Sequence, residues 1–124
     1  MKKPMRALFG AASLVFASAA VPAHAQVSYE CSGIGLDERQ TAERIPHTLR
    51  VEYAQPDGHY LGGAETTVSD ASGNQLVSVR CPGPWVLLQL PDGRYIVTAT
   101  FGDQTKSSQV TISGGQRQRQ LFVF

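Results

Sequence analysis

Two histidines and four aspartates are the side chains of this sequence whose chemistry is easiest to recognise. His47 and His59 are the histidines beyond residue 25, and Asp57 lies two positions before His59. This spacing matches no zinc-site pattern. Glycine-containing turns hold the four aspartates, Asp57, Asp70, Asp92 and Asp103. Calcium needs about six or more oxygens at one point, whereas aspartate in such a turn usually bonds to the backbone. The sequence therefore predicts turn chemistry, no metal site and no cofactor.

Catalysis by a nucleophilic side chain has little support. A hydrolase needs a nucleophile, a base and a group that orients the base. Serines are present, but the Gly-x-Ser-x-Gly motif does not occur. We therefore expect a protein without catalytic residues.

Candidate contacts for a ligand or a partner are Arg117, Arg119 and Trp85. The two arginines would share one face of a strand. There they could bind a carboxylate or phosphate, or they could keep an edge strand solvated. Trp85 could stack on a sugar, but the apolar run that follows it favours a position in the core or at its rim.

The first 25 residues predict export. Basic residues before position 7 precede an apolar stretch over 7–21, and Ala23-His24-Ala25 provides a small-residue exit before Gln26. These are the three parts of a secretory signal peptide, cleaved between Ala25 and Gln26. The apolar stretch is shorter than the about 20 residues of a membrane-spanning helix. We expect a periplasmic or secreted protein without a membrane span, with an uncleaved N-terminal anchor as the alternative.

Removal of residues 1–25 would change the charge of the chain. The 124 residues include 11 basic and 10 acidic side chains, for a net charge of +1. Three of the basic side chains and none of the acidic ones lie in 1–25, so the remaining 99 residues carry 8 basic against 10 acidic, or −2. Ninety-nine residues fit one small domain. A mildly acidic surface gives no electrostatic footprint for nucleic acid.

Cys31 and Cys81 are the two cysteines of the chain. In an oxidising compartment such a pair is most simply a disulfide. Closing a loop of about 50 residues would stabilise the domain by ~4 kcal/mol in the chain-entropy model. A reactive or metal-binding pair is the alternative, which the lack of a Cys-x-x-Cys spacing disfavours.

Residues 26–46 are expected to form a lead-in with a short helix at about 37–45. Asp37 opens a pattern that resembles a capping box, and Pro46 would end the helix. Leu36, Ala42 and Ile45 would be its apolar contacts.

From residue 47 onward the apolar residues recur with a period of two, which is typical of strands. The expected strands are 49–53, 64–69, 75–79, 85–90, 95–101, 106–113 and 116–124. The run 85–90 is nearly all apolar, which predicts a strand covered on both faces. Pro91-Asp92-Gly93 is interpreted as a hairpin-type turn. Seven short strands with close turns predict an antiparallel seven-stranded β-sandwich over 47–124.

Three segments resemble the carboxypeptidase regulatory-like domains, a transthyretin-like (prealbumin-like) family. They read VSDASGNQLV at 68–77, GPWVLL at 83–88 and LPDGRYIVTA at 90–99. The resemblance covers about residues 33–124 and is greatest to small exported proteobacterial proteins of unassigned function. It implies a transthyretin-like sandwich and says little about activity.

The same family includes enzymes, and the end of this chain departs from them. Transthyretin-like proteins that hydrolyse 5-hydroxyisourate end in Tyr-Arg-Gly-Ser and use histidines and an arginine around a tetramer channel. This chain ends in Gln120-Leu121-Phe122-Val123-Phe124. The resemblance therefore does not imply a hydrolase here.

Our leading hypothesis is an exported, non-enzymatic interaction or envelope-associated module. Residues 116–124 would pair with a protein partner in the cell envelope by strand addition. The alternative is a binder of a small ligand or glycan through Trp85 or the aspartate turns, and the third hypothesis is a transthyretin-like hydrolase.

Overall fold

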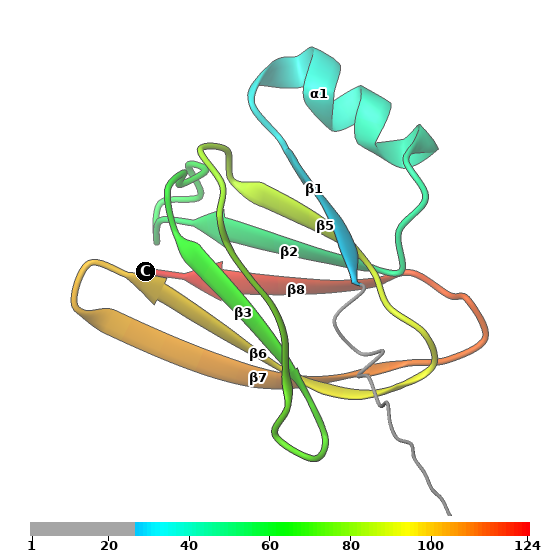
Figure 1. The fold of residues 1–124 in the computed structure, drawn as a ribbon. Helices are drawn as coiled ribbons and strands as arrows, with labels where there is room; N and C mark the ends of the chain where they lie inside the picture. The colour runs from blue at the N-terminus through cyan, green and yellow to red at the C-terminus, as the bar shows by residue number, and fades with distance from the viewer. Residues whose placement is uncertain (1–26) are drawn as a thin grey trace, which may run out of the picture.

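The computed structural model describes residues 27–124, so the predicted signal peptide and its cleavage site lie outside the described residues. The described chain forms a β-sandwich of two four-stranded sheets, ordered β1-β5-β2-β8 and β4-β3-β6-β7 (Figure 1). The elements are β1 Ser28–Ser32, α1 Gly35–Thr41, the 3₁₀ turn η2 Ala42–Arg44, β2 Leu49–Ala54, β3 Glu65–Asp70, β4 Gln75–Arg80, β5 Trp85–Gln89, β6 Gly93–Phe101, β7 Gln104–Ile112 and β8 Gln118–Val123.

The predicted sandwich is confirmed, with two corrections to its strands. The described residues form eight strands rather than seven, because β1 belongs to the first sheet, where it pairs antiparallel with β5. Four of its five residues are exposed, so it carries no apolar alternation that a sequence pattern could reveal. The sandwich is also not wholly antiparallel, since β8 runs parallel to β2.

The turn Pro91-Asp92-Gly93 joins two sheets and not two paired strands. β5 and β6, which flank it, lie in different sheets, so the hairpin interpretation was wrong. Tyr95 donates its hydroxyl to the Pro91 carbonyl at 2.7 Å, which fixes this crossing. Alternation of apolar residues predicts that two neighbouring segments are strands, but it does not say whether the two strands pair.

The helix begins earlier than predicted and packs differently. α1 starts at Gly35, after Ile34, whose N–H donates to the Glu38 carboxylate at 2.9 Å. Asp37 therefore lies inside the helix and caps nothing. Leu36, an expected apolar contact, is 61% exposed. Only Ala42 and Ile45 of the expected set contact the sheet, where they pack against β5.

Alternate residues of β2 and β5 separate the core from the outer face. Leu49, Val51 and Tyr53 of β2 point between the sheets, together with Val86 and Leu88 of β5. The other face of β5 is covered too, because Trp85 and Leu87 pack under Ala42 and Ile45. β5 is therefore buried on both faces, as its apolar run predicts.

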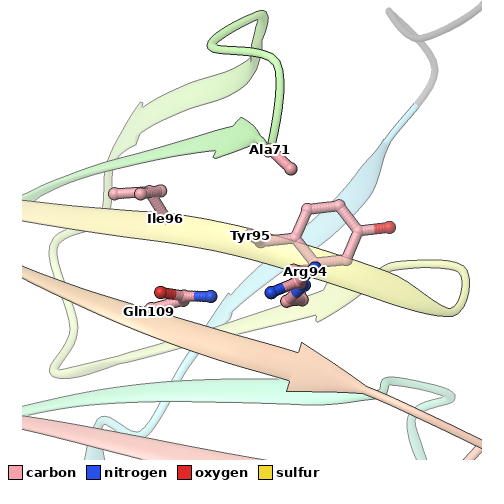
Figure 2. Close-up of a pocket in the computed structure, with 5 residues that line it drawn as sticks. All are labelled: Ala71, Arg94, Tyr95, Ile96 and Gln109. Carbon is pink, nitrogen blue, oxygen red and sulfur yellow. The ribbon is translucent and has the colours of Figure 1, made fainter.

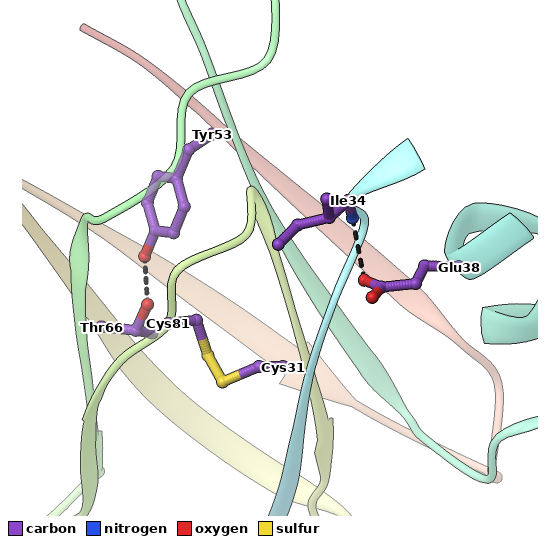
Figure 3. The surroundings of a disulfide bond; sticks show 6 residues. All are labelled: Cys31, Ile34, Glu38, Tyr53, Thr66 and Cys81. Atoms are coloured by element: carbon purple, nitrogen blue, oxygen red, sulfur yellow. Dashed lines mark hydrogen bonds between the residues drawn. A yellow bond between two sulfur atoms is a disulfide. The ribbon is translucent and has the colours of Figure 1, made fainter. Parts of the chain in front are cut away.

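Covalent and polar links join the two sheets (Figure 3). Cys31 of β1 forms the predicted disulfide with Cys81, which follows β4, at a Cα–Cα distance of 5.5 Å. Tyr53 of β2 shares a hydrogen bond with the buried Thr66 of β3. Burial raises the pKa of Tyr53 to about 12, so its hydroxyl stays protonated. These links hold β1 and β2 at fixed positions over the second sheet.

Within residues 27–124, no helix has the length and apolar character needed to cross a bilayer.

Candidate functional site

The outer face of the sheet β1-β5-β2-β8 carries a connected cluster of ion pairs. Because Leu49, Val51 and Tyr53 face the core, Arg50 and Glu52 of β2 must face outward. Arg50 lies opposite Arg119 of β8 in the parallel ladder. Strand pairing thus brings together charges that lie far apart in the sequence.

A hollow of about 230 Å³ opens on this face. We call it the arginine hollow, and its lining residues are Glu43, His47, Arg50, Arg117, Gln118 and Arg119. Glu43 lies in η2 and Arg50 in β2. Arg119 lies in β8, and Arg117 is the residue just before β8. Arg117 and Arg119, both named by the sequence, therefore meet in one place.

Glu52 is the buried anchor of this charge cluster. Its side chain is 1% exposed, and both of its oxygens accept from Arg119, from Nε and Nη2, at 2.8 Å each. Arg50 Nε lies 2.6 Å from Glu52 Oε2 as an ion pair, although it is not aimed well enough for a hydrogen bond. Hydrogen bonding to Glu52 raises the pKa of Arg119 further above its ordinary value. A buried carboxylate needs such partners, so Glu52 fixes both guanidinium groups.

His47 is buried beside the hollow and is held as a neutral ring. Burial, followed by the charges of Arg117 and Arg50, lowers its pKa below the ordinary value of 6.5 against the opposing hydrogen bond to Ile45. Nδ1 lies 2.6 Å from the Ile45 carbonyl oxygen. A carbonyl only accepts, so Nδ1 carries the proton and Nε2 keeps its lone pair. His47 can therefore accept a hydrogen bond or a proton.

Arg117 is tied mainly to backbone oxygens. Nη2 donates to the carbonyls of Glu43 at 3.0 Å and Ile45 at 3.3 Å, and Nε donates to the carbonyl of His47 at 3.3 Å. Nη1 donates to the Glu43 side chain at 3.3 Å. The side chain thus links the residue before β8 to the turn after α1.

Trp85 lies next to this cluster but offers no open ring. It is 5% exposed, with Arg50 stacked 4.2 Å from its ring centre and Tyr60 against its edge. A Cβ on Gly33 would meet the ring at 2.8 Å, so only glycine fits there. Its indole N–H has no acceptor among residues 27–124. Trp85 thus packs as a wall residue that supports Arg50.

Asp57 and Asp70 bond to the backbone of their own turns, whereas Asp92 accepts from the N–H of Gly114 at 3.3 Å. Asp70 accepts from the N–H groups of Ser72 and Asn74 at 2.9 and 3.0 Å. Asp57 accepts from the N–H of His59, which lowers its pKa, and pairs with the His59 ring at 3.0 Å. Across the described chain, His, Cys, Asp and Glu side chains do not gather in threes that could hold a metal.

A second hollow, of about 330 Å³, lies on the opposite sheet (Figure 2). Arg94, Tyr95 and Ile96 of β6 line it with Gln109 of β7 and Ala71. It offers one cation and one amide, and no histidine or carboxylate lines it. We therefore regard the arginine hollow as the better candidate for binding chemistry.

β8 is an edge strand within the described chain, since it pairs only with β2. The N–H of Gln118 donates to the carbonyl of Thr48, just before β2, at 2.8 Å, and the N–H of Phe124 donates to the carbonyl of Ala54 in β2 at 3.0 Å. Alternate residues of a strand bond to opposite sides. The N–H groups of Arg119, Leu121 and Val123 therefore point away from β2, toward the open side.

Comparison with known proteins identifies the fold. No family model and no curated protein matches the chain. Among solved structures, the chain is similar to 5-hydroxyisourate hydrolase of Klebsiella pneumoniae, with a TM-score of 0.51 and 17% sequence identity over 63% of this chain and 89% of that one. The fold is transthyretin-like. At this identity the likeness shows a shared fold and does not bear on activity.

The sequence does not assign Glu43, Arg50 or Glu52 to the same site as Arg117 and Arg119. Glu52 holds Arg119 and Glu43 contacts Arg117, yet Glu52 lies 67 positions from Arg119 and Glu43 lies 74 from Arg117. Arg50 and Glu52 alternate with the apolar Leu49, Val51 and Tyr53, which predicts that they face outward. This pattern does not predict which strand pairs with β2. The parallel pairing of β2 with β8 brings these residues together, and the sequence does not show that pairing.

Proposed function

We propose that this chain is an exported, non-enzymatic transthyretin-like domain that binds a protein partner of the cell envelope along β8. Export is supported by the basic and apolar pattern of residues 1–25. The disulfide between Cys31 and Cys81 fits an oxidising compartment. An edge strand adds a partner strand through its free backbone groups.

The single observation that carries this proposal is the direction of the backbone groups of β8. The N–H groups of Arg119, Leu121 and Val123 face the open side. The Val123 carbonyl accepts from Lys106 at 2.5 Å, and the Leu121 carbonyl accepts from the Gln120 side chain at 3.1 Å. These carbonyls meet side chains and not β2, which agrees with an outward row. Leu121 is 40% exposed in the middle of that row.

Proline at position 121 tests strand addition directly. Leu121→Pro removes an outward N–H, which β2 does not use, so pairing with β2 is kept while one donor to a partner is lost. We expect affinity purification from the envelope to recover a partner with the wild type, and at least about tenfold less of it with Leu121→Pro.

Leu121→Ala is the matched control, because it removes the side chain and keeps the N–H. Equal recovery with Leu121→Pro and wild type would contradict binding along β8. Thermal unfolding of both variants checks that the sandwich stays folded.

A hydrolase is the second candidate, and one observation favours it. His47, with an available lone pair, converges with Arg50, Arg117 and Arg119, which supplies a base beside cations that could stabilise an oxyanion. The residues that line the hollow include no hydroxyl or thiol, so water would have to be the nucleophile. Turnover of 5-hydroxyisourate that is lost in His47→Asn would establish this candidate, and absence of turnover would remove it.

A further inference from the structure

The two carboxylates that pair with the arginines of the hollow are held in very different ways. Glu52 is 1% exposed and contacts its arginines at 2.6 to 2.8 Å. Glu43 is 65% exposed, and its two oxygens lie 3.3 Å from Arg50 Nη1 and 3.3 Å from Arg117 Nη1. Exposed ion pairs of this kind contribute little net stability. Glu52 is thus a structural anchor, whereas Glu43 is a loosely held counter-ion.

The guanidinium groups do not depend on Glu43 for their positions. Arg50 is fixed by Glu52 and by stacking on Trp85. Arg119 is held by both oxygens of Glu52. Arg117 is fixed by the three backbone carbonyls described above. If the Glu43 side chain swung into solvent, two Nη1 groups would still face the same space.

The charge of the hollow also favours an added anion. The three arginines pair with two carboxylates, Glu43 and Glu52, and His47 is neutral, so a positive charge is left over. Arg117 and Arg119 are 41% and 56% exposed, so an incoming group can reach them. Without Glu43 the excess would rise to two charges. Preorganised cations of this kind bind oxyanions with low ordering cost.

We propose that the arginine hollow is a carboxylate-binding site in which Glu43 is the exchangeable internal occupant. An incoming carboxylate would take the place of the Glu43 side chain, with one oxygen on Arg50 Nη1 and the other on Arg117 Nη1. The volume of about 230 Å³ suits a small organic acid or one acidic side chain. This site is separate from the outward N–H groups of β8.

The carboxylate has two sources with the same chemistry. One is a free organic acid, and the other is an aspartate or glutamate of a polypeptide segment. Arg117 and Arg119 lie at the start of β8, so an acidic side chain on a strand added to β8 would pass the hollow. The test below separates the two sources.

Glu43→Gln is the decisive variant, because it removes the competitor and leaves all three arginines. Succinate is titrated at constant ionic strength while the backbone amide NMR signals of Arg50, Arg117 and Gln118 are followed. We expect saturable shifts in the wild type and roughly three- to tenfold tighter binding in Glu43→Gln. Arg117→Gln should weaken binding by about tenfold.

Glu30→Gln is the matched control, because it makes the same charge change on β1, at the opposite edge of the sheet. A peptide of alternating glutamate and threonine forms the second arm. Tighter binding of the peptide assigns the site to an acidic segment, and equal or weaker binding assigns it to a free acid. Shifts that do not saturate, or equal affinities of wild type, Glu43→Gln and Glu30→Gln, would overturn the proposal.

Strand addition and carboxylate binding fail separately in these experiments. Leu121→Pro leaves every side chain of the hollow in place, so loss of partner recovery in that variant does not bear on succinate binding. Conversely, Glu43→Gln leaves the outward N–H groups of β8 unchanged.

Discussion

His47 is a buried histidine whose protonation state affects both hydrogen bonding in the hollow and the stability of the fold. Its ring is 5% exposed, and its one hydrogen bond to Ile45 fixes the tautomer. Burial, and then the charges of neighbouring Arg117 and Arg50, oppose its protonation. A neutral buried histidine beside cations is available to accept hydrogen bonds, and it makes the fold sensitive to acid.

The free energy of unfolding should fall in acid because of His47. Its pKa in the folded chain is lowered below 6.5, so below that pH the unfolded chain binds more protons than the folded chain. Stability is therefore retained above the unfolded pKa and is lost as the pH falls toward the folded pKa. The slope from this group is at most about 1.4 kcal/mol per pH unit.

His47→Asn should remove that contribution, because asparagine does not titrate. Its amide N–H can still donate to the Ile45 carbonyl, so the hydrogen bond is kept. Urea unfolding of both proteins near neutral pH and about two units lower measures the difference in slope. Equal loss of stability in wild type and variant would contradict this account of His47.

The sequence predicted residues of the candidate site but not their partners. Arg117 and Arg119 stood out because they alternate on one strand, and they do meet in one hollow. Their carboxylate partners lie on β2 and η2, and no local pattern connects segments that far apart. Trp85 was predicted to be a core or rim residue from its apolar neighbours, and it is buried.

At the scale of elements, β1 and η2 turn an outer sheet face into a site. β1 is paired only with β5 among the described strands and is tied to the second sheet through Cys31. Gly33 then brings the chain past Trp85, and η2 places Glu43 over the arginines. Seven strands could be predicted from their apolar alternation or, for 85–90, from a continuous apolar run. β1 could not, because an edge strand with few buried side chains has no such alternation.

Replacing both cysteines by alanine should weaken the domain by about 4 kcal/mol, because the disulfide closes a loop of about 50 residues. Urea unfolding measures this loss. β1 should also open first, since it is an edge strand, and hydrogen exchange at Tyr29 and Glu30 should speed up more than exchange in β2.

Wild-type protein treated with a reductant serves as the control and should match the double variant. Unchanged stability, or faster exchange in β2 and β1 alike, would show that the disulfide does not hold the edge of the sheet.

At the scale of the whole molecule, the described chain is a sandwich whose two sheets are joined by a disulfide and whose strand β8 lies at the edge of one sheet. Ser108 of β7, in the other sheet, donates to the Gln120 side chain of β8 at 2.8 Å. β8 itself is left with three outward N–H groups beside a cationic hollow. The sandwich class could be predicted from strand spacing and turns. The parallel pairing that makes β8 the edge could not, because side-chain alternation is the same in parallel and antiparallel strands.

Photo-crosslinking in intact cells tests partner binding along β8 most directly. A photoreactive side chain replaces Leu121 on β8 or, as the control, Ile96 on β6 of the other sheet; the two residues are 40% and 42% exposed. The proposal predicts a discrete crosslinked product from position 121, its loss when Val123→Pro removes a neighbouring outward N–H, and no such product from position 96. Equal products from both positions, or none from position 121, would contradict it.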